Sequence, residues 1–155
     1  MKFKYVTVLG IVALLSVGCA ANVESQQSET QQTAQTVAQT PDAASVKASG
    51  TFIDAEHPTK GTASIITENG KKYIQFDNQF KSDSGPDLFV ILHKDDELPI
   101  TGIKEADYVS IAPLKKTSGT QKYEIPENVD LANFKSVAIW CRQFNATFGY
   151  AVLKA

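Results

Sequence analysis

Two apolar segments near the C-terminal end, residues 136–142 and 148–153, restrict the fold of this chain more than any other feature. Both are rich in β-branched and aromatic residues, and residues 143–147 between them are mostly polar or small, a pattern typical of two antiparallel strands joined by a five-residue loop. Alternation places two sets of side chains on opposite faces of the first strand: Val137, Ile139 and Cys141 on one, and Ala138, Trp140 and Arg142 on the other. Because most of both faces is apolar, we expect a central strand that is covered on both sides.

Six further segments with the composition of strands precede this hairpin: residues 50–53, 62–67, 71–76, 87–93, 108–112 and 121–125. Asn69 and Gly70 separate the second from the third, and both residue types tolerate positive φ, so we expect a tight hairpin there. Residues 130–134 suit one helical turn or a corner. About eight short strands without a long helical period predict an all-β fold. An antiparallel β-sandwich is the first expectation, and an open β-barrel is the alternative.

The first eighteen residues have the character of a secretion signal. Two lysines precede an apolar stretch, residues 6–15, which is too short to span a bilayer. The sequence Leu15-Ser-Val-Gly-Cys19 resembles a bacterial lipobox, with Ser16 in place of the more common leucine. The resemblance implies cleavage before Cys19, a diacylglycerol on its sulfur and an acyl chain such as palmitate on its amine.

Several acyl chains would hold the protein durably at a membrane, where a single chain binds only marginally. We therefore expect a membrane-anchored, extracytoplasmic lipoprotein. In a bacterium with two membranes it would lie at the outer membrane or face the periplasm, and otherwise at the cell surface. An ordinary secretory signal with a leftover thiol at Cys19 is the alternative.

Residues 19–48 form the next part of the chain and contain no aromatic residue. Their Gln-, Ser- and Thr-rich composition cannot bury enough apolar surface to offset the entropy of ordering, which predicts a disordered linker. A Gln-rich interaction tract is the alternative. From residue 49 the composition becomes that of a folded domain, so we expect one β domain over residues 49–155.

Short motifs spread over residues 49–155 occur in the order of a known family. They are Gly50-Thr-Phe52, His57, Gly61, Gly85-Pro-Asp-Leu88, the stretch 119–126, the stretch 137–144 and Phe148-Gly149. On these motifs the segment resembles the DM-thirteen (DM13) domain, a cysteine-containing β domain often found beside DOMON domains. Lys116 departs from the pattern by replacing a glycine, which loosens the turn expected there. The resemblance implies an extracytoplasmic domain in which Cys141 takes part in redox or electron transfer with a protein partner.

Cys141 is the candidate redox residue, and three roles are open to it. It can be a small buried hydrophobe on a central strand. It can be a reactive thiol, which requires a nearby cation, helix N-terminus or metal to stabilise the thiolate, or a bound cofactor. It can also form an intermolecular disulfide, because a lipidated Cys19 would leave it without a partner in its own chain. Arg142 is adjacent, but side chains alternate along a strand, so we expect it to point away.

Metal and cofactor chemistry depends on few residues. A blue-copper site needs two histidines, a cysteine and usually a methionine, but the mature chain would hold only His57 and His93 and no methionine. A looser Cys/His metal site or a haem held by the two histidines is an open alternative. We expect His57 before Pro58 to be a surface turn residue and His93 at a strand end to be solvated. The cofactor therefore stays unknown, and we predict no metal.

Few other residues of the chain are candidates for binding a metal ion or carrying electrons. Asp77, Asp83 and Asp87 fall in one long loop and could offer oxygens to calcium, although solvated turns are the simpler interpretation. Four aromatic residues of the final hairpin could carry electrons, but strand spacing favours core packing for Trp140, Phe144, Phe148 and Tyr150.

No hydrolase or phosphate-loop motif is present, which argues against an enzyme. The formal net charge of −2 gives no footprint for nucleic acid.

Overall fold

The computed structural model describes residues 44–155. The predicted signal peptide, the lipid site at Cys19 and all but the end of the predicted linker lie outside the described residues. Within this part of the chain, no helix is long and apolar enough to cross a membrane.

The described residues form ten strands and two short 3₁₀ turns. Their order is β1 (Ser45–Asp54), β2 (Thr59–Lys60), β3 (Thr62–Glu68), β4 (Lys71–Phe76), β5 (Lys81–Ser82), β6 (Leu88–His93), η1 (Glu105–Asp107), β7 (Tyr108–Pro113), β8 (Gln121–Glu124), η2 (Leu131–Asn133), β9 (Ser136–Cys141) and β10 (Ala146–Val152). The all-β prediction is therefore confirmed, and η2 forms the single turn expected near residue 130.

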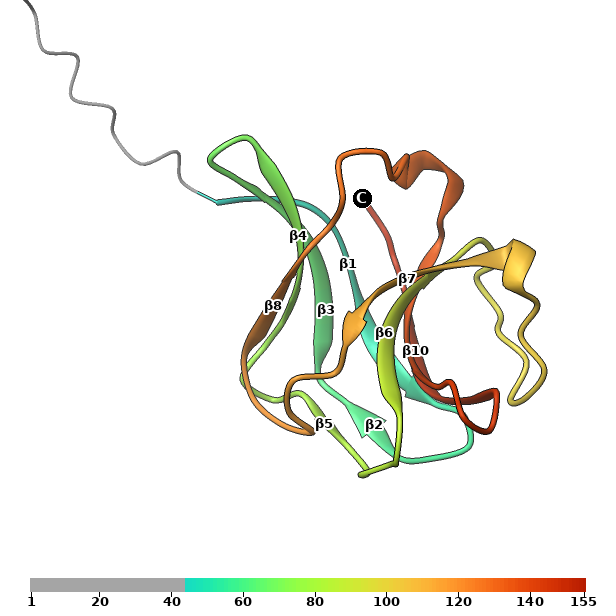
Figure 1. Ribbon diagram of the computed structural model, residues 1–155. Coiled ribbons are helices and arrows are strands. Elements are labelled where there is room, and N and C mark those ends of the chain that lie inside the picture. The colour runs from blue at the N-terminus through green and yellow to red at the C-terminus, as the bar shows by residue number, and fades with distance from the viewer. Residues whose placement is uncertain (1–43) are drawn as a thin grey trace, which may run out of the picture. The chain divides into compact units, whose positions relative to one another are not determined.

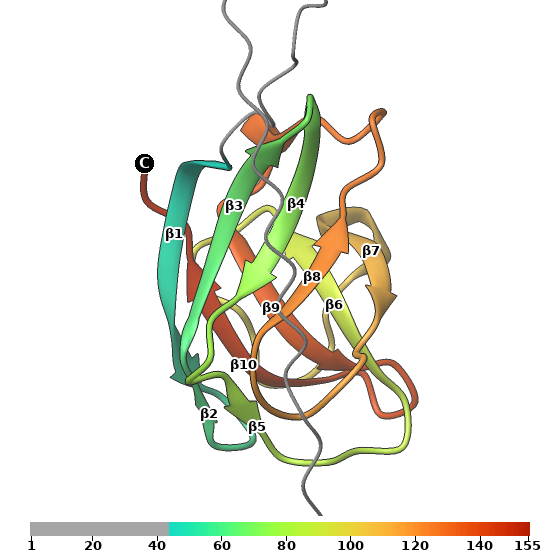
Figure 2. The same ribbon diagram turned by 90° about the vertical axis from the view of Figure 1, so that its left-hand side faces the viewer.

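Eight of these strands form one antiparallel sheet in the order β7-β6-β9-β10-β1-β3-β4-β8 (Figures 1 and 2). The long strand β1 joins the two halves, because its first residues pair with β3 while Phe52 to Asp54 pair with β10. The sheet curls around its apolar face until the edge strands β7 and β8 approach each other, so that it nearly closes into a barrel. Of the two predicted architectures, the arrangement is that of the open barrel.

At the seam between the edge strands, hydrogen bonds from buried side chains of β8 hold the loop that connects β7 to β8. The Tyr123 hydroxyl accepts from the backbone N–H of Lys115 at 3.0 Å and donates to Gln121 Oε1 at 2.6 Å. The Gln121 amide also accepts from the Lys116 N–H at 3.1 Å and donates to the Lys116 carbonyl at 2.9 Å. The Gln121 side chain thus fixes the turn at Lys116, and the loosening expected from a lysine at this position is not observed. Burial raises the pKa of Tyr123, which keeps its hydroxyl able to donate.

β9 lies between two apolar clusters, and all six of its residues are buried. Val137, Ile139 and Cys141 belong to the large cluster inside the barrel, together with the rings of Phe52, Phe76, Phe80, Phe148 and Tyr123. Ala138 and Trp140 belong to a second cluster outside the barrel, with Ile91, Leu98 and Ile103. Leu98 and Ile103 come from the segment between β6 and β7, which covers the outer face of β9. The predicted central strand, covered on both sides, is confirmed.

Strand pairing moves the predicted first residue of two strands. β1 begins at Ser45, because residues 45–48 pair with β3, although the sequence assigned them to the linker. β10 begins at Ala146, so the last hairpin has a four-residue loop rather than five, and Asn145 adopts a φ of 48° there. The Asn69-Gly70 hairpin is as predicted, with φ values of 52° and 75° at the two residues.

We expect Tyr123→Phe to destabilise the domain by about 1–2 kcal/mol, because the Lys115 N–H and Gln121 Oε1 both lose a partner at the buried seam. Tyr73→Phe is the matched control, since Tyr73 lies on the neighbouring strand β4 and its hydroxyl has no hydrogen-bond partner among residues 44–155. Urea unfolding followed by Trp140 fluorescence measures both. Equal stability of the two variants would contradict the role of the seam.

Candidate functional site

Cys141 is the last residue of β9, and its thiol lies inside the barrel. The residue is fully buried, with 0% of its surface exposed. In the sheet it pairs with Leu88 of β6 on one side and with Ala146 of β10 on the other. Residues directly opposite in an antiparallel ladder share a face, with Cβ atoms about 5 Å apart. Leu88 and Ala146 are therefore the cross-strand neighbours of the thiol, and both are buried in the same apolar cluster.

The cation nearest to Cys141 in sequence does not face the thiol. The Arg142 side chain is exposed and donates to the Asp87 carboxylate at 2.9 and 3.3 Å. Its guanidinium also lies 4.4 Å from the centre of the Phe89 ring. Arg142 thus points away from the thiol, as strand alternation predicts. Asp87 braces its turn through this ion pair, not through its own backbone as an Asx turn would.

Residues 83–87, here called the covering segment, lie over the end of the barrel that holds Cys141. The segment runs from β5 to β6 along the lower edge of Figure 2. A depression of about 390 Å³ on one side of it is lined by Leu88, and one of about 250 Å³ on the other side by Ala146. Ser84, Gly85 and Pro86 line both depressions. The two cross-strand neighbours of Cys141 therefore line two surface depressions that share the residues of this segment.

His57 lies beside the covering segment. Its Nδ1 is 3.2 Å from the Asp83 carboxylate, and its ring packs on Phe148 with the ring centres 3.9 Å apart. The His57 side chain is 36% exposed, which agrees with the expected surface turn. Asp83 thus contacts one ring nitrogen, and His57 also lines the smaller depression.

His93 differs from its expectation, because it is buried and not solvated. Only 2% of its surface is exposed, and its Nδ1 accepts from the backbone N–H of Asp95 at 3.1 Å. It pairs with Ser136 at the far end of β9, five residues along β6 from Leu88. At about 3.3 Å per residue this separation is about 16 Å, too far to share a ligand with Cys141. Two histidines and Cys141 therefore do not form one metal site.

The acidic residues considered for calcium are bonded separately. Asp77 accepts from the backbone N–H of Gln79, whereas Asp83 and Asp87 pair with His57 and Arg142. No cluster of three or more His, Cys, Asp or Glu side chains able to hold a metal occurs within residues 44–155.

The aromatic residues of the final hairpin divide between the core and the surface. Trp140 and Phe148 are buried and Tyr150 is half-buried, which confirms the core prediction for these three. Phe144 is 63% exposed at the hairpin tip, so the core prediction is wrong for this residue. The Trp140 indole donates to Asn145 Oδ1 at 3.0 Å, and this bond holds the tip against the strand. An exposed Phe144 consequently lines the depression next to His57.

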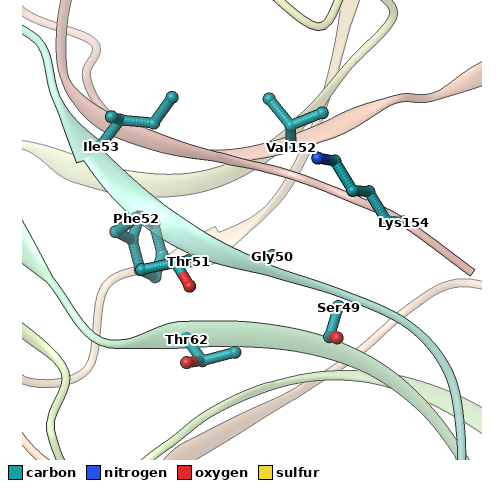
Figure 3. A pocket seen from close by; sticks show the side chains of 8 residues that line it. All are labelled: Ser49, Gly50, Thr51, Phe52, Ile53, Thr62, Val152 and Lys154. Atoms are coloured by element: carbon teal, nitrogen blue, oxygen red, sulfur yellow. The ribbon is translucent and has the colours of Figure 1, made fainter.

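A groove of about 550 Å³ runs along β1 (Figure 3) and shares no lining residue with the two depressions beside the covering segment. Gly50 is required there, because a Cβ atom would lie 2.1 Å from the Val152 carbonyl oxygen. Ser49, Thr51 and Thr62 line the groove with Lys154, the one titratable side chain around it (Figure 3). A single lysine among hydroxyl groups offers no acid–base pair or nucleophile with a base, so we assign it no chemistry.

Fold and site together define a small antiparallel β-barrel domain with one buried cysteine on its central strand. The family model described as "Electron transfer DM13" matches residues 51–153. The chain therefore belongs to the DM13 family, and the resemblance seen in the sequence is confirmed. No curated protein and no solved structure gives a match.

We expect Cys141→Ser to destabilise the domain more than Cys141→Ala. Serine would bury a hydroxyl among apolar side chains, which costs about 1–3 kcal/mol when it has no partner. Alanine leaves only a small cavity and costs about 1 kcal/mol. Urea unfolding of the two variants compares these costs directly. A serine variant as stable as the alanine variant would reveal a polar partner for residue 141 inside the barrel.

Proposed function

We propose that this protein takes part in electron transfer outside the cytoplasm and that Cys141 is its redox-active residue. The membership of residues 51–153 in an electron-transfer family is the observation that carries the proposal. Two features of the site support it. Cys141 is held by a rigid strand with fixed neighbours on both sides, and the barrel end above it has depressions where a small reactant or a side chain of a partner could approach.

A lone thiol can carry out redox chemistry without a second cysteine. The thiolate attacks one oxygen of a peroxide, the O–O bond breaks, and the leaving oxygen takes up protons as water or alcohol. The sulfur has then lost two electrons and is a sulfenic acid. A thiol from a redox partner protein condenses with it to a mixed disulfide and releases water, and a second thiol restores Cys141.

We propose further that lipid on Cys19 anchors the protein at a membrane and that residues 20–44 tether the domain. The lipobox-like sequence before Cys19 supports this anchor. In the domain itself, β1 begins at the end that carries the Asn69-Gly70 turn and ends at Asp54, near β10 residue Gly149. The chain thus enters the barrel at the end opposite to the covering segment (Figure 2). The Cys141 end of the barrel would be free to face a partner.

A non-enzymatic interaction module of the cell envelope is the second candidate function. The complete burial of Cys141 in an apolar cluster favours it, because a buried free cysteine commonly acts as a small hydrophobic side chain. In that case the exposed Phe144 and the depression beside it would provide the contact surface, and the thiol would be structural.

Treatment of the native full chain with hydrogen peroxide separates the two functions. We expect Cys141 to be oxidised to sulfenic acid under native conditions, trapped with dimedone and located by peptide mass spectrometry, while Cys141→Ala gives no adduct. An absorption spectrum of the untreated protein checks for a bound chromophore. A native thiol that stays reduced until the domain unfolds, in a protein without a chromophore, would exclude the redox function and leave the interaction module.

We expect Cys19→Ala to abolish lipidation, because the thioether to diacylglycerol forms on the Cys19 sulfur. Membrane fractionation and intact-mass measurement of the bacterial protein test this, with Cys141→Ala as the matched cysteine control. Lipid on the Cys19→Ala variant, or none on the Cys141→Ala control, would refute the anchor.

A further inference from the structure

We propose that residues 83–87, the covering segment, form a lid that opens locally and gives reagents access to Cys141. The opening of this segment is inferred from the fold and does not depend on the function of Cys141. The use of opening in redox chemistry rests on the proposed function of Cys141.

The covering segment is the element placed directly over the neighbours of the thiol. Leu88, which pairs with Cys141, follows it immediately in the chain. A Cβ atom added to Gly85 would come within 2.9 Å of both Leu88 Cδ2 and Phe148 Cζ, so the segment packs on these side chains without a gap. Moving the segment would uncover Leu88 on one side and Ala146 on the other, and both flank Cys141 in the sheet.

The covering segment has few backbone restraints. Before it, the Ser82 N–H donates to the Thr117 carbonyl, and at its end the Asp87 carbonyl accepts from the Arg142 N–H. Between these two bonds, the backbone of residues 83–86 makes no hydrogen bond to any other residue within 44–155. The strands on both sides of Cys141 are held by antiparallel ladders, of which the one to β10 has an irregularity between Thr147 and Gly149. Segments with few internal hydrogen bonds open at lower free energy than the sheet they cover.

Two exposed contacts, here called the clasp, hold the covering segment, one at each end: a hydrogen bond between His57 and Asp83, and an ion pair between Arg142 and Asp87. His57 holds Asp83 with an N–O distance of 3.2 Å, and Arg142 holds Asp87 with N–O distances of 2.9 and 3.3 Å. Exposed ion pairs contribute little to stability, so this clasp can release without unfolding the barrel.

The buried residue just before the covering segment lacks a hydrogen-bond partner for its side chain. Ser82 is 5% exposed, and its hydroxyl is a buried side-chain oxygen without a hydrogen-bond partner within the described part of the chain. An unsatisfied buried hydroxyl raises the free energy of the closed state, because it gains hydrogen bonds to water when the region opens. The closed lid is thus packed on apolar side chains, is held at both ends by contacts of surface side chains, and follows a residue whose buried hydroxyl favours opening.

Labelling of Cys141 with iodoacetamide in the native full chain tests the lid, with Cys141 identified by peptide mass spectrometry. Asp83→Asn and Asp87→Asn each remove one carboxylate of the clasp and keep the size of the side chain. We expect each to raise the labelling rate roughly two- to five-fold. Gly85→Ala, which acts through packing and not charge, is expected to raise the rate as well.

Glu124→Gln is the matched control. Glu124 forms a similarly exposed ion pair with Lys71, at an N–O distance of 2.7 Å, on strands β8 and β4 away from Cys141. We expect this variant to label at the wild-type rate. Low concentrations of urea should also leave the wild-type rate unchanged, because local opening exposes little surface.

Two results would overturn the lid. One is a labelling rate that rises equally in Glu124→Gln and in the clasp variants. The other is a rate that follows global unfolding, measured by Trp140 fluorescence, at every urea concentration. Both would mean that Cys141 is reached only by unfolding of the barrel. Failure of the redox function is a separate outcome, in which Cys141 labels through the lid but does not react with peroxide.

Discussion

The complete burial of β9 is the constraint on which the rest of this structure depends. A strand with apolar side chains on both faces needs cover on both sides, and the chain supplies it in two different ways. The sheet curls so that Val137, Ile139 and Cys141 face a barrel interior filled by aromatic rings. The segment between β6 and β7 folds over the other face and buries Trp140. The cysteine is therefore fixed by the packing that makes the fold.

The same constraint shapes the chemistry that Cys141 can perform. Inside an apolar barrel no cation or hydrogen-bond donor is directed at the thiol from its own strand, because Arg142 turns to Asp87. Reactivity then depends on access. The barrel end above Cys141 is closed by a short segment whose two ends are held by contacts of surface side chains. Next to it lies the β7–β8 loop, in which the buried Tyr123 and Gln121 hold Lys115 and Lys116.

Much of the fold could be predicted from sequence. Local signals were sufficient where neighbouring residues decide the structure, as in the Asn69-Gly70 turn and the alternating β9 strand. The features that the sequence did not predict correctly depend on contacts between residues that are distant in the chain. His93 looked like a solvated strand end but is covered by later segments, and Phe144 looked like core but lies at the tip of a hairpin that Asn145 shortens. Residues 45–48 looked like linker because their cover comes from β3.

The candidate site was predicted only in part. Cys141 and its burial follow from the strand pattern. The side-chain contacts of Asp83 with His57 and of Asp87 with Arg142 join residues 26 and 55 positions apart, which no local pattern indicates. Asp87 was expected to be a solvated turn residue, but it pairs with Arg142, the residue next to the cysteine. The one available signal was the presence of both residues in motifs shared with the family.

Turnover of hydrogen peroxide by the native full chain, with a small thiol as reductant, tests the central claim most directly. The account predicts that the wild-type protein reduces each peroxide at the expense of two thiols and that this turnover is lost in Cys141→Ala, while the variant keeps the fold and the fluorescence of Trp140. Turnover that persists without Cys141, or none above background from the wild type, would contradict a redox role for this cysteine.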